Sequence, residues 1–331
     1  MLLATACGGP DAPPIELTGH TMGTSYSIKL IPDPGIAARD SLQQAVDARL
    51  AEINRQMSTY LPDSDLMRFN LAQSDQWQAV PAALVELIER AQQISLLSDG
   101  MYDVTVGPLV NLWGFGSSGT RDTPPTAQQI AALLPLVGFK HLQTRRSPPG
   151  LRKTVTGLQV DLSSIAKGWA VDQIAGLLRE RGVRNFLVEI GGEVYASGEK
   201  HPGEGWHIAI EQPLYDRRAV ERVIELHDMA VATSGDYRNF FPAGDRLYSH
   251  TIDPRSGQAV QHRLASVTVL ADNCTDADAW ATALMALGDR RAGVLADRQG
   301  LKALLILRGD RGLIEQPSKA LSSSATWRGQ H

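Results

Sequence analysis

The chain has 331 residues, of which 43% are hydrophobic and 21% are charged. This length suits one large domain or two of ordinary size, and this composition is that of a globular protein. The 32 Lys and Arg against 36 Asp and Glu give a formal charge of −4. Such a balance argues against a nucleic-acid partner, which calls for a basic excess. The two cysteines, Cys7 and Cys274, exclude a disulfide scaffold and a zinc cluster.

The first 14 residues have the features of a truncated bacterial lipoprotein signal. A short apolar and small-residue stretch, Leu2 to Ala6, precedes Cys7, and Gly, Pro and Asp follow. The charged segment and the longer apolar segment of a full signal are missing, so an ordinary chain end is the alternative. No apolar run approaches the ~18 residues of a membrane-spanning helix. If the lipoprotein interpretation holds, Cys7 carries lipid and the protein is anchored to a membrane without spanning it.

The first half of the chain is predicted to be mainly helical after an initial strand. Residues 15–30 have a strand pattern that is interrupted at residues 22–24. Ser41 with Gln44, and Thr126 with Gln129, have the spacing of capping boxes at helix starts. The predicted helices of this half cover residues 41–57, residues 81–98 and a short stretch from residue 126. A Pro- and Gly-containing loop is expected at residues 145–150.

The second half is predicted to be rich in short strands. These strands lie at residues 158–162, 186–190, 193–197, 206–211, 220–226, 229–233, 264–271 and 303–307. Helices are expected at residues 164–181 and 276–287, and the last 20 residues are polar and Ser-rich, as in an extended tail. Helices early in the chain and clustered strands later favour an α+β fold over a regularly alternating one.

Two short motifs indicate chemistries that their surroundings do not support. Gly114, Gly116 and Gly119 spell G-x-G-x-x-G, but the prolines that follow cannot begin the helix of a dinucleotide site. Ser164 and Lys167 spell S-x-x-K, the acylating element of penicillin-binding enzymes. The accompanying K-T-G element is absent, so a capped helix start with an incidental Lys is the stronger interpretation.

Other clusters are weak when taken singly. Asp278 and Thr282 are four residues apart on a predicted helix, so they share one face and could offer oxygen ligands to Mg²⁺. Such a pair is more often solvated or capping, and Asp276 is the expected helix cap. The segment from His250 to Gly257 combines a His, two hydroxyls, an Asp and an Arg at a strand end, and it also has the composition of a turn.

Taken together and in order, these stretches resemble the ApbE family of FAD:protein FMN transferases. The matching segments are MGTSYSI (22–28), MSTYLPDSDLMRFN (57–70), MYDVTVGPLVNLWGFG (101–116), VDLSSIAKGWAVD (160–172), LVEIGGEVYASG (187–198), VATSGDY (231–237), YSHTIDPRSGQ (248–258) and DADAWATALMALG (276–288). The resemblance covers residues 15–310 and implies one α+β domain with mixed or antiparallel sheets flanked by helices, followed by a tail at 311–331.

The resemblance also implies an activity. FAD binds with Mg²⁺ at its pyrophosphate, and the FMN moiety is transferred to a Thr or Ser hydroxyl of a target flavoprotein, forming a phosphoester and releasing AMP. The implied targets are subunits of redox pumps of the sodium-translocating quinone reductase or Rnf type. The implied location is the periplasmic side of the bacterial inner membrane, with the lipid on Cys7 as the anchor.

By resemblance, particular residues take particular roles. His250 is the candidate that assists deprotonation of the acceptor hydroxyl. The candidates for binding FAD are Met22, Tyr60, Met101, Tyr102, Asp103, Ser163, Trp169 and Ile252. The candidates at the Mg²⁺ site are the carbonyl of Ala166, the side chains of Asp278 and Thr282, and the adjacent Ala281.

Three other functions stay open at this stage. A Mg²⁺-dependent FAD pyrophosphatase would use the same residues, with water replacing the acceptor hydroxyl and FMN and AMP as products. A flavin-binding protein without catalysis would not need Asp278, Thr282 and His250 together. A serine acyl-transfer enzyme would be labelled at Ser164 by a β-lactam.

Overall fold

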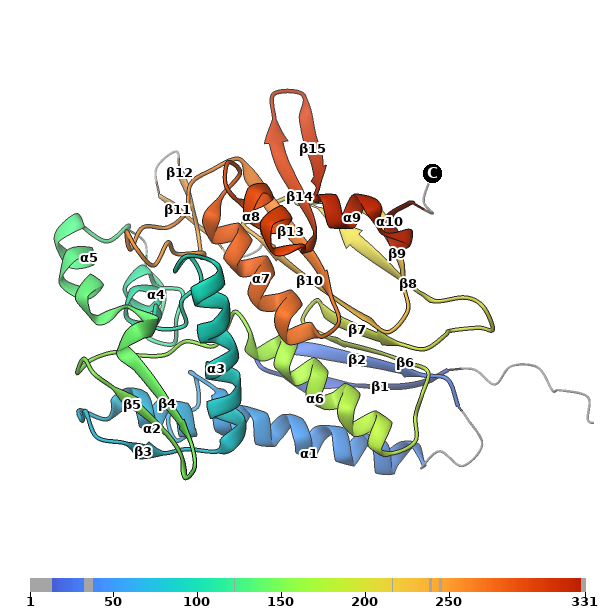
Figure 1. Ribbon diagram of the computed structural model, residues 1–331, viewed down its shortest axis with the longest axis horizontal. Coiled ribbons are helices and arrows are strands. Elements are labelled where there is room, and N and C mark those ends of the chain that lie inside the picture. Colours follow the sequence, from blue (N-terminus) through green and yellow to red (C-terminus); the bar gives the residue numbers. More distant parts are fainter. Residues whose placement is uncertain are drawn as a thin grey trace, which may run out of the picture.

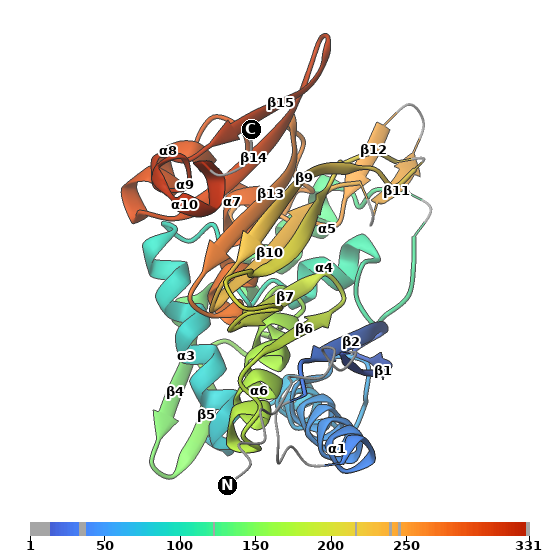
Figure 2. The same cartoon turned by 90° about the vertical axis from the view of Figure 1, so that its right-hand side faces the viewer.

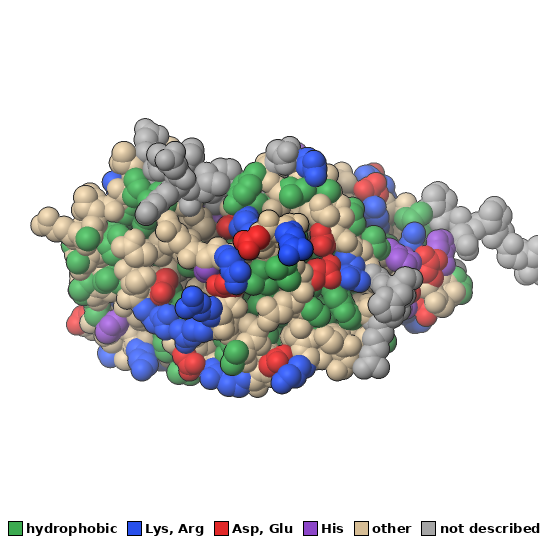
Figure 3. Space-filling view, turned by 90° about the horizontal axis from the view of Figure 1, so that it is seen from above, with side chains coloured by type: hydrophobic (Ala, Val, Ile, Leu, Met, Phe, Trp, Pro, Cys, Tyr) green, Lys and Arg blue, Asp and Glu red, His purple; other side chains and the backbone are tan. Residues whose placement is uncertain are grey.

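The computed structural model describes residues 14–32, 38–121, 123–215, 217–237, 240–243 and 246–328. The expected lipoprotein signal, with Cys7, lies outside these residues. No helix in the described part of the chain is long and apolar enough to cross a bilayer. On the face seen in Figure 3, basic and acidic side chains are interspersed among polar and hydrophobic ones.

The centre of the molecule is an eight-stranded sheet in which neighbouring strands are antiparallel (Figure 1). Its strands, in spatial order, are β1 (Ile15–Thr21), β2 (Thr24–Leu30), β6 (Phe186–Ile190), β7 (Glu193–Ser197), β10 (Met229–Gly235), β13 (Leu264–Ala271), β14 (Lys302–Gly309) and β15 (Gly312–Pro317). Side chains of a strand alternate between its two faces, so this sheet needs a cover on both sides.

Helices cover one face of the sheet. They are α1 (Arg39–Met57), α3 (Ala82–Leu97), α6 (Ala166–Glu180) and α7 (Cys274–Leu287). Their apolar stripes form the largest hydrophobic core with inward-facing strand residues such as Leu17, Ile28 and Val267. Figure 1 shows α6 and α7 lying across the middle strands of the sheet.

The opposite face is covered by a two-stranded ribbon and two short C-terminal helices. The ribbon consists of β8 (Trp206–Glu211) and β9 (Val220–Leu226), and the helices are α9 (Lys319–Ser323) and α10 (Ala325–Arg328). Trp206, Ile210 and Leu321 join Val231 and Leu304 of the sheet in a second core. The ribbon therefore lies on the other side of the sheet from α7.

Smaller elements surround this centre. They are α2 (Asp65–Leu71), α4 (Gly107–Trp113), α5 (Ala127–Leu133), α8 (Ala292–Gln299), β3 (Gln78–Ala79), β4 (Leu142–Arg146), β5 (Pro149–Lys153), β11 (Phe240–Ala243) and β12 (Arg246–Ser249). A third apolar cluster packs α4 and α5 against Ile252 and Ala259. This cluster fixes the segment that follows β12.

The α+β expectation is confirmed, and several predicted boundaries are confirmed to the residue, namely those of β6, β7, β8, β9 and β13. The predicted capping box of Thr126 and Gln129 is present. Two other predicted caps are wrong. Helix α1 begins at residue 39 without a side-chain cap, so Ser41 lies inside it, and Asn273 rather than Asp276 caps α7.

Three predicted segments differ from the structure. The expected loop at 145–150 is the turn of the β4–β5 hairpin, which gains further pairing from β3. The expected strand at 158–162 makes only an isolated bridge, because side-chain and loop hydrogen bonds replace the ladder there. The expected tail contains β15, which extends the sheet, and α9, which buries Leu321.

Candidate active site

A cavity of about 1150 Å³ opens where two central strands diverge. Strands β7 and β10 pair only through Met229–Val231 and Val194–Ala196, whereas β10 continues to Gly235. In the described part of the chain, no strand pairs with this edge of β10 beyond Val231. Figure 2 shows β10 rising away from β6 and β7, with α4 beside the opening. The divergence creates the space that a ligand needs inside an otherwise continuous sheet.

Most of the residues singled out from the sequence line this one cavity. They are Tyr60, Met101, Tyr102, Asp103, Ser163, His250, Ile252, Asp278 and Thr282. The remaining four, Met22, Ala166, Trp169 and Ala281, are not among the lining residues. Met22 and Trp169 pack against the main core, and Ala281 is fully buried within it. Ala166 is the first residue of α6, next to the lining residue Lys167.

Two buried acidic side chains and a partly buried lysine lie at the inner end of the cavity. Lys167 Nζ is 2.6 Å from Glu193 Oε1 and 4.0 Å from Asp278 Oδ1. The second oxygen of Asp278 accepts a hydrogen bond from the Gly168 amide at 3.0 Å. Glu193 Oε2 is buried without a hydrogen-bond partner in the described part of the chain. A buried oxygen of this kind is a natural position for a cationic ligand.

Burial controls the protonation of these groups. It raises the pKa of Glu193 to about 7, although the Lys167 ammonium acts in the opposite direction. It also raises the pKa of Asp278, against the opposing effects of Lys167 and the Gly168 amide. Burial alone would lower the pKa of Lys167, but the two carboxylates more than offset it, so Lys167 stays charged. The cavity thus holds one cation beside two acidic groups whose charged forms are disfavoured by burial.

The oxygen donors present fit a Mg²⁺ ion. Asp278 supplies a carboxylate, and Thr282, one helical turn further along α7, supplies a hydroxyl that lies 3.0 Å from Ser234 Oγ. Mg²⁺ in enzymes is usually bound by one or two carboxylates together with waters and substrate phosphates, rather than by a cage of protein ligands. Among the described residues, no group of three or more His, Cys, Asp or Glu side chains is arranged so that it could hold a metal ion.

Helices α6 and α7 come unusually close together at this point. A Cβ atom on Gly168 would lie 2.3 Å from the carbonyl oxygen of Cys274 and 2.9 Å from Cβ of Asp278. Only glycine therefore allows this approach. Asp172, one turn further along α6, accepts hydrogen bonds from the amides of Cys274 and Thr275 at 2.7 and 2.8 Å. The two contacts fix Asp278 relative to the start of α6.

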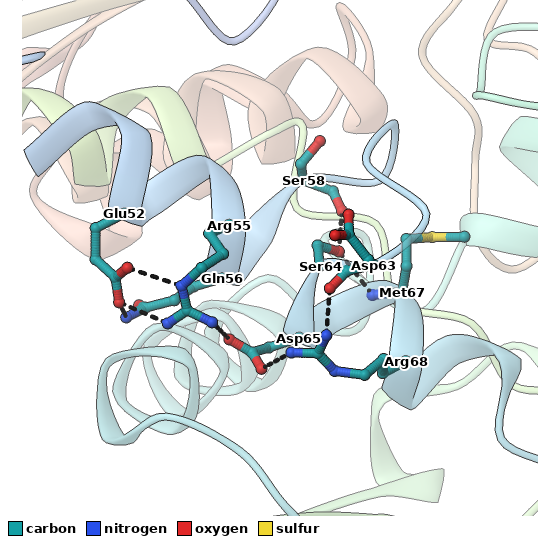
Figure 4. A network of polar contacts seen from close by, with 9 residues as sticks. All are labelled: Glu52, Arg55, Gln56, Ser58, Asp63, Ser64, Asp65, Met67 and Arg68. Atoms are coloured by element: carbon teal, nitrogen blue, oxygen red, sulfur yellow. Dashed lines mark hydrogen bonds and ion pairs between the residues drawn. The ribbon is translucent and has the colours of Figure 1, made fainter. Parts of the chain in front are cut away.

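The loop that carries Tyr60 is held by a polar network (Figure 4). Ser58 Oγ accepts hydrogen bonds from the amides of Tyr60 and Leu61, both at 3.1 Å. Ser64 Oγ donates to the Ser58 carbonyl at 2.6 Å and caps α2. The Tyr60 side chain itself remains 69% exposed, so an aromatic ring is presented at the cavity on a rigid loop.

Arginine 55 and its acidic neighbours connect this loop to α1. Arg55 reaches Glu52 at 2.7 Å within α1 and Asp65 at 2.8 Å at the start of α2. Arg68 also binds Asp65, at 2.5 Å, and donates to the carbonyl of Asp63. Figure 4 shows the two arginines on either side of the Asp65 carboxylate. The network orients α2 against α1, and the loop between the two helices carries Tyr60.

The wall near Tyr102 is fixed by buried hydrogen bonds. The Ser164 hydroxyl donates to the Tyr102 hydroxyl at 3.0 Å. Asp103 accepts hydrogen bonds from the Thr105 amide and hydroxyl, at 2.8 and 2.6 Å, and from the Phe139 amide at 2.7 Å. Burial nevertheless raises the pKa of Asp103. Ser164 is thus engaged by a tyrosine and Lys167 by a glutamate, which gives no support to a serine acyl-transfer pair.

Two hydrogen bonds between the Asn70 side chain and the backbone of Val160 hold the neighbouring segment of the cavity wall. The Asn70 side chain donates to the carbonyl of Val160 and accepts from its amide, both at 2.8 Å. The fully buried Lys153 donates to the carbonyls of Asn70 and Leu158 at 3.0 and 3.1 Å. Asp161, the residue after Val160, lines the cavity.

His250 lies in the loop after β12, on the side of the cavity near α4. Its ring is 6.3 Å from that of Phe115, in an edge-on arrangement. The following turn is closed by a hydrogen bond from the Gly257 amide to the Asp253 carbonyl at 2.8 Å, and Ile252 forms a bridge with Ala259. The expected combination of a turn with pocket-facing His and Ile is therefore present. Gly114, in the same wall, ends α4 in a left-handed conformation, so the glycine motif follows a helix and not a strand.

Sequence reasoning missed several residues of the site. Glu193 was not singled out, although it follows Gly191 and Gly192 at the start of a strand. Lys167 was taken as incidental, and the roles of Gly168, Asp172 and Asn70 depend on partners about 100 residues away. The only sequence signal for Gly168, Asp172 and Asn70 was that they lie in two of the stretches that resemble the ApbE family, 57–70 and 160–172.

Comparison with known proteins agrees with this geometry. The ApbE family profile matches residues 22–305. A curated FAD:protein FMN transferase from Vibrio cholerae is 44% identical over 97% of this chain and 95% of its own length. The solved flavin transferase ApbE from Vibrio cholerae has a TM-score of 0.86 at 43% identity, covering 93% of this chain and 98% of that one. The apo form of the Pseudomonas stutzeri flavinyl transferase ApbE also has a TM-score of 0.86, at 41% identity over 93% and 96% of the two chains. The chain belongs to the ApbE family.

Proposed function

We propose that this chain is a Mg²⁺-dependent FAD:protein FMN transferase. It transfers the FMN moiety of FAD to a Thr or Ser hydroxyl of a protein and releases AMP. One observation carries the proposal: Asp278, Thr282, His250 and the exposed aromatic ring of Tyr60 line the same cavity. The curated relatives that match nearly the whole chain bear the transferase name.

The FAD substrate takes the length of the cavity. Tyr60, Met101 and Tyr102 offer aromatic and thioether surfaces that suit a flat heteroaromatic ring. Lys167 and the amino-terminal end of α6 favour the negatively charged pyrophosphate at the inner end. Ile252 and Ser163 complete the lining between these two ends. Met22 and Trp169 support the wall from the core side.

The metal ligands are Asp278, Thr282 and the carbonyl of Ala166. When bound, Mg²⁺ neutralises the charge that develops on the leaving phosphate. The residues of this chain hold it in place: Gly168 fixes one Asp278 oxygen through its amide, and Ser234 orients the Thr282 hydroxyl. Ala281 contributes through its place in α7, since its side chain has no donor atom.

His250 accepts the proton of the acceptor hydroxyl. The O–H bond of the Thr or Ser breaks as its oxygen bonds to the FMN phosphorus, the proton moves to a ring nitrogen of His250, and the P–O bond to AMP breaks. A neutral imidazole with an ordinary pKa of ~6.5 is suited to this step at neutral pH. A general base of this kind contributes roughly 10² to 10⁴ in rate.

The acceptors belong to membrane redox pumps of the sodium-translocating quinone reductase or Rnf type. The enzyme acts on the periplasmic side of the inner membrane, held by a lipid on Cys7. The sequence pattern around Cys7 supports the anchor, and the resemblance to the ApbE family supports these acceptors. Labelling of the full chain by an alkyne fatty acid in bacteria, lost in Cys7→Ser, is the expected result. Labelling that persists in the variant would contradict the anchor.

Mass spectrometry of an acceptor protein tests the activity. Incubation with FAD and Mg²⁺ should add the mass of FMN less water, and EDTA should prevent the gain. Asp278→Ala should abolish it, whereas Asp276→Ala is the matched control, because Asp276 pairs with Arg90 at 2.5 Å rather than facing the cavity. His250→Ala should slow transfer far more than it weakens FAD binding. Free FMN and AMP without a labelled acceptor would establish the pyrophosphatase instead.

A further inference from the structure

The ribbon of β8 and β9 has two outer edges, and the residues that line the cavity belong to β8. Strand β8 pairs along its whole length with β9, from Trp206 opposite Leu226 to Glu211 opposite Val220. The two strands form a sheet of their own in the described part of the chain, so the other edge of β8 has no strand beside it. An unpaired edge presents a row of backbone N–H and C=O groups.

The cavity runs alongside this free edge. Ile208 and Ile210 point toward the sheet and pack in the second core, whereas the alternating Ala209 points away from it and is exposed. All three residues line the cavity, and so does Glu211. Because neighbouring side chains of a strand point to opposite faces, a space that touches consecutive residues must meet the strand at its edge.

The cavity passes around the edge of β10 in the same way. Val231 belongs to the core under the ribbon, whereas Ser234 bonds to Thr282 of α7 on the other face. Both line the cavity, which therefore connects the free edge of β8 with the metal ligands.

We propose that the free edge of β8 binds the acceptor segment of the protein substrate as an added β-strand. The inference rests on the proposed transferase function, which requires a Thr or Ser on another protein to enter this cavity. Main-chain hydrogen bonds supply the affinity in such strand addition, and alternate side chains supply the specificity. The hydroxyl to be modified is then selected by its reach to His250 along the bound strand.

Short peptides with one threonine test this mode of binding. From a synthetic library, the best acceptor is chosen by the mass gain of one FMN, and each backbone amide is then N-methylated in turn. Strand addition predicts that sensitivity to methylation alternates along the peptide, because every second amide faces β8. Methylation of an amide that faces β8 should raise the acceptor KM at least tenfold, whereas methylation of the other amides should leave the KM unchanged. Uniform sensitivity, or none, would overturn the inference.

A matched pair of variants tests the position on the enzyme. Ala209→Trp adds bulk at the free edge, and Val223→Trp adds it at the exposed cross-strand partner on β9, away from the cavity. Ala209→Trp should raise the acceptor KM at least tenfold and leave the Kd for FAD unchanged, whereas Val223→Trp should change neither. Equal effects of the two variants, or a loss of FAD binding alone in Ala209→Trp, would overturn the assignment.

Failure of the inference and failure of the proposed function give different results. If no peptide is labelled but a folded acceptor protein is, recognition requires a folded surface and the strand-addition inference is wrong. If FAD is converted to free FMN and AMP and neither acceptor is labelled, the transferase proposal itself is wrong.

Discussion

Replacing Asp172 with alanine tests whether one side chain holds α7, the helix that carries the proposed metal ligands, in position. Asp172 lies on α6, and its carboxylate accepts three hydrogen bonds from the start of α7: the Cys274 amide at 2.7 Å, the Thr275 amide at 2.8 Å and the Thr275 hydroxyl at 2.5 Å. The first amides of a helix have no partner within it, so these bonds act as a cap supplied by another helix. Asp278 and Thr282 follow on the same helix α7.

The magnitude follows from the number of bonds. Burial raises the pKa of Asp172, although its hydrogen bonds act in the opposite direction. Desolvation of the carboxylate therefore offsets much of the extra strength that a charged acceptor gives to a hydrogen bond. Each bond is taken to contribute about 1 kcal/mol to the free energy of unfolding. Loss of three bonds should destabilise the protein by about 3 kcal/mol. With an unfolding entropy of roughly 2.1 cal/mol/K per residue, a chain of 331 residues should lose about 4 °C in Tm. Asp172→Asn, which keeps one acceptor oxygen, should lose about half as much.

The sign of the pH dependence is also fixed. Because the folded-state pKa of Asp172 lies above its ordinary value of 3.8, folding favours the protonated carboxyl. The stability that this group contributes is therefore complete below pH 3.8 and decreases as pH rises through the folded pKa. Asp172→Asn cannot ionise, so its destabilisation relative to wild type should be largest near pH 4 and smaller at pH 7.

Urea unfolding at several pH values measures both effects, and Mg²⁺ titration of activity measures the consequence for the site. Asp172→Ala should raise the Mg²⁺ concentration for half-maximal activity severalfold with an unchanged urea m-value. A loss of stability below 1 kcal/mol, or a pH trend of opposite sign, would refute the reasoning about the cap.

Three further substitutions test how the walls of the site are held. Gly168→Ala should raise the Mg²⁺ requirement at least tenfold, because its methyl group would meet the first backbone carbonyl of α7 at 2.3 Å; an unchanged titration would contradict the close approach. Ser64→Ala should weaken FAD binding about three- to tenfold in calorimetry, since the loop of Tyr60 loses a bond of about 1 kcal/mol. Asn70→Ala should lower the free energy of unfolding, measured by urea denaturation, by about 2–4 kcal/mol, since both backbone groups of Val160 lose their partner. A change below 1 kcal/mol would contradict the role given to these two hydrogen bonds.

Local sequence rules predicted those elements whose information is local. The strands β6 to β9 have clear apolar patterns bounded by glycine or polar turns, and their limits agree with the structure. The capping box of Thr126 and Gln129 formed as predicted, whereas the same pattern at Ser41 did not, because α1 starts two residues earlier. A cap requires an extended backbone at the capping residue, and the sequence does not specify this.

Tertiary partners decided the remaining cases. Residues 158–162 have a strand composition, but Asn70, 90 residues earlier, satisfies Val160, and Val104 accepts from the Asp161 amide. The hairpin β4–β5 contains Pro and Gly and was expected to be a loop, yet pairing with β3 makes it part of a sheet. Within the expected polar tail, the short sequence GLIEQP forms the edge strand β15 (Gly312–Pro317), whose burial alternates as is typical of a strand with one solvent-facing side.

For the site, nine of the thirteen residues named by resemblance line one cavity, and the structure adds the charged groups beside them. No short-range pattern connects Lys167 with Glu193, because they come from α6 and β7 and meet only when the helix packs on the sheet. Glycine 168 gave no signal of its own, since a helix-interior glycine is normally only a cost in stability. The reason for glycine is seen only in the structure, where a Cβ atom at position 168 would lie 2.3 Å from the carbonyl oxygen of Cys274 in α7.

The charge balance of the cavity supports the proposal that FAD binds together with a divalent cation. Lys167 forms its close ion pair with Glu193, at 2.6 Å, and Asp278, 4.0 Å from Lys167, adds a second acidic group. A pyrophosphate alone would add two negative charges to this buried space, and Mg²⁺ alone would add two positive ones. Either change is costly where water is scarce, whereas the pair leaves the net charge unchanged. The divergence of β7 from β10 provides the space, and the charges at its inner end favour the proposed metal–pyrophosphate pair over either ion alone.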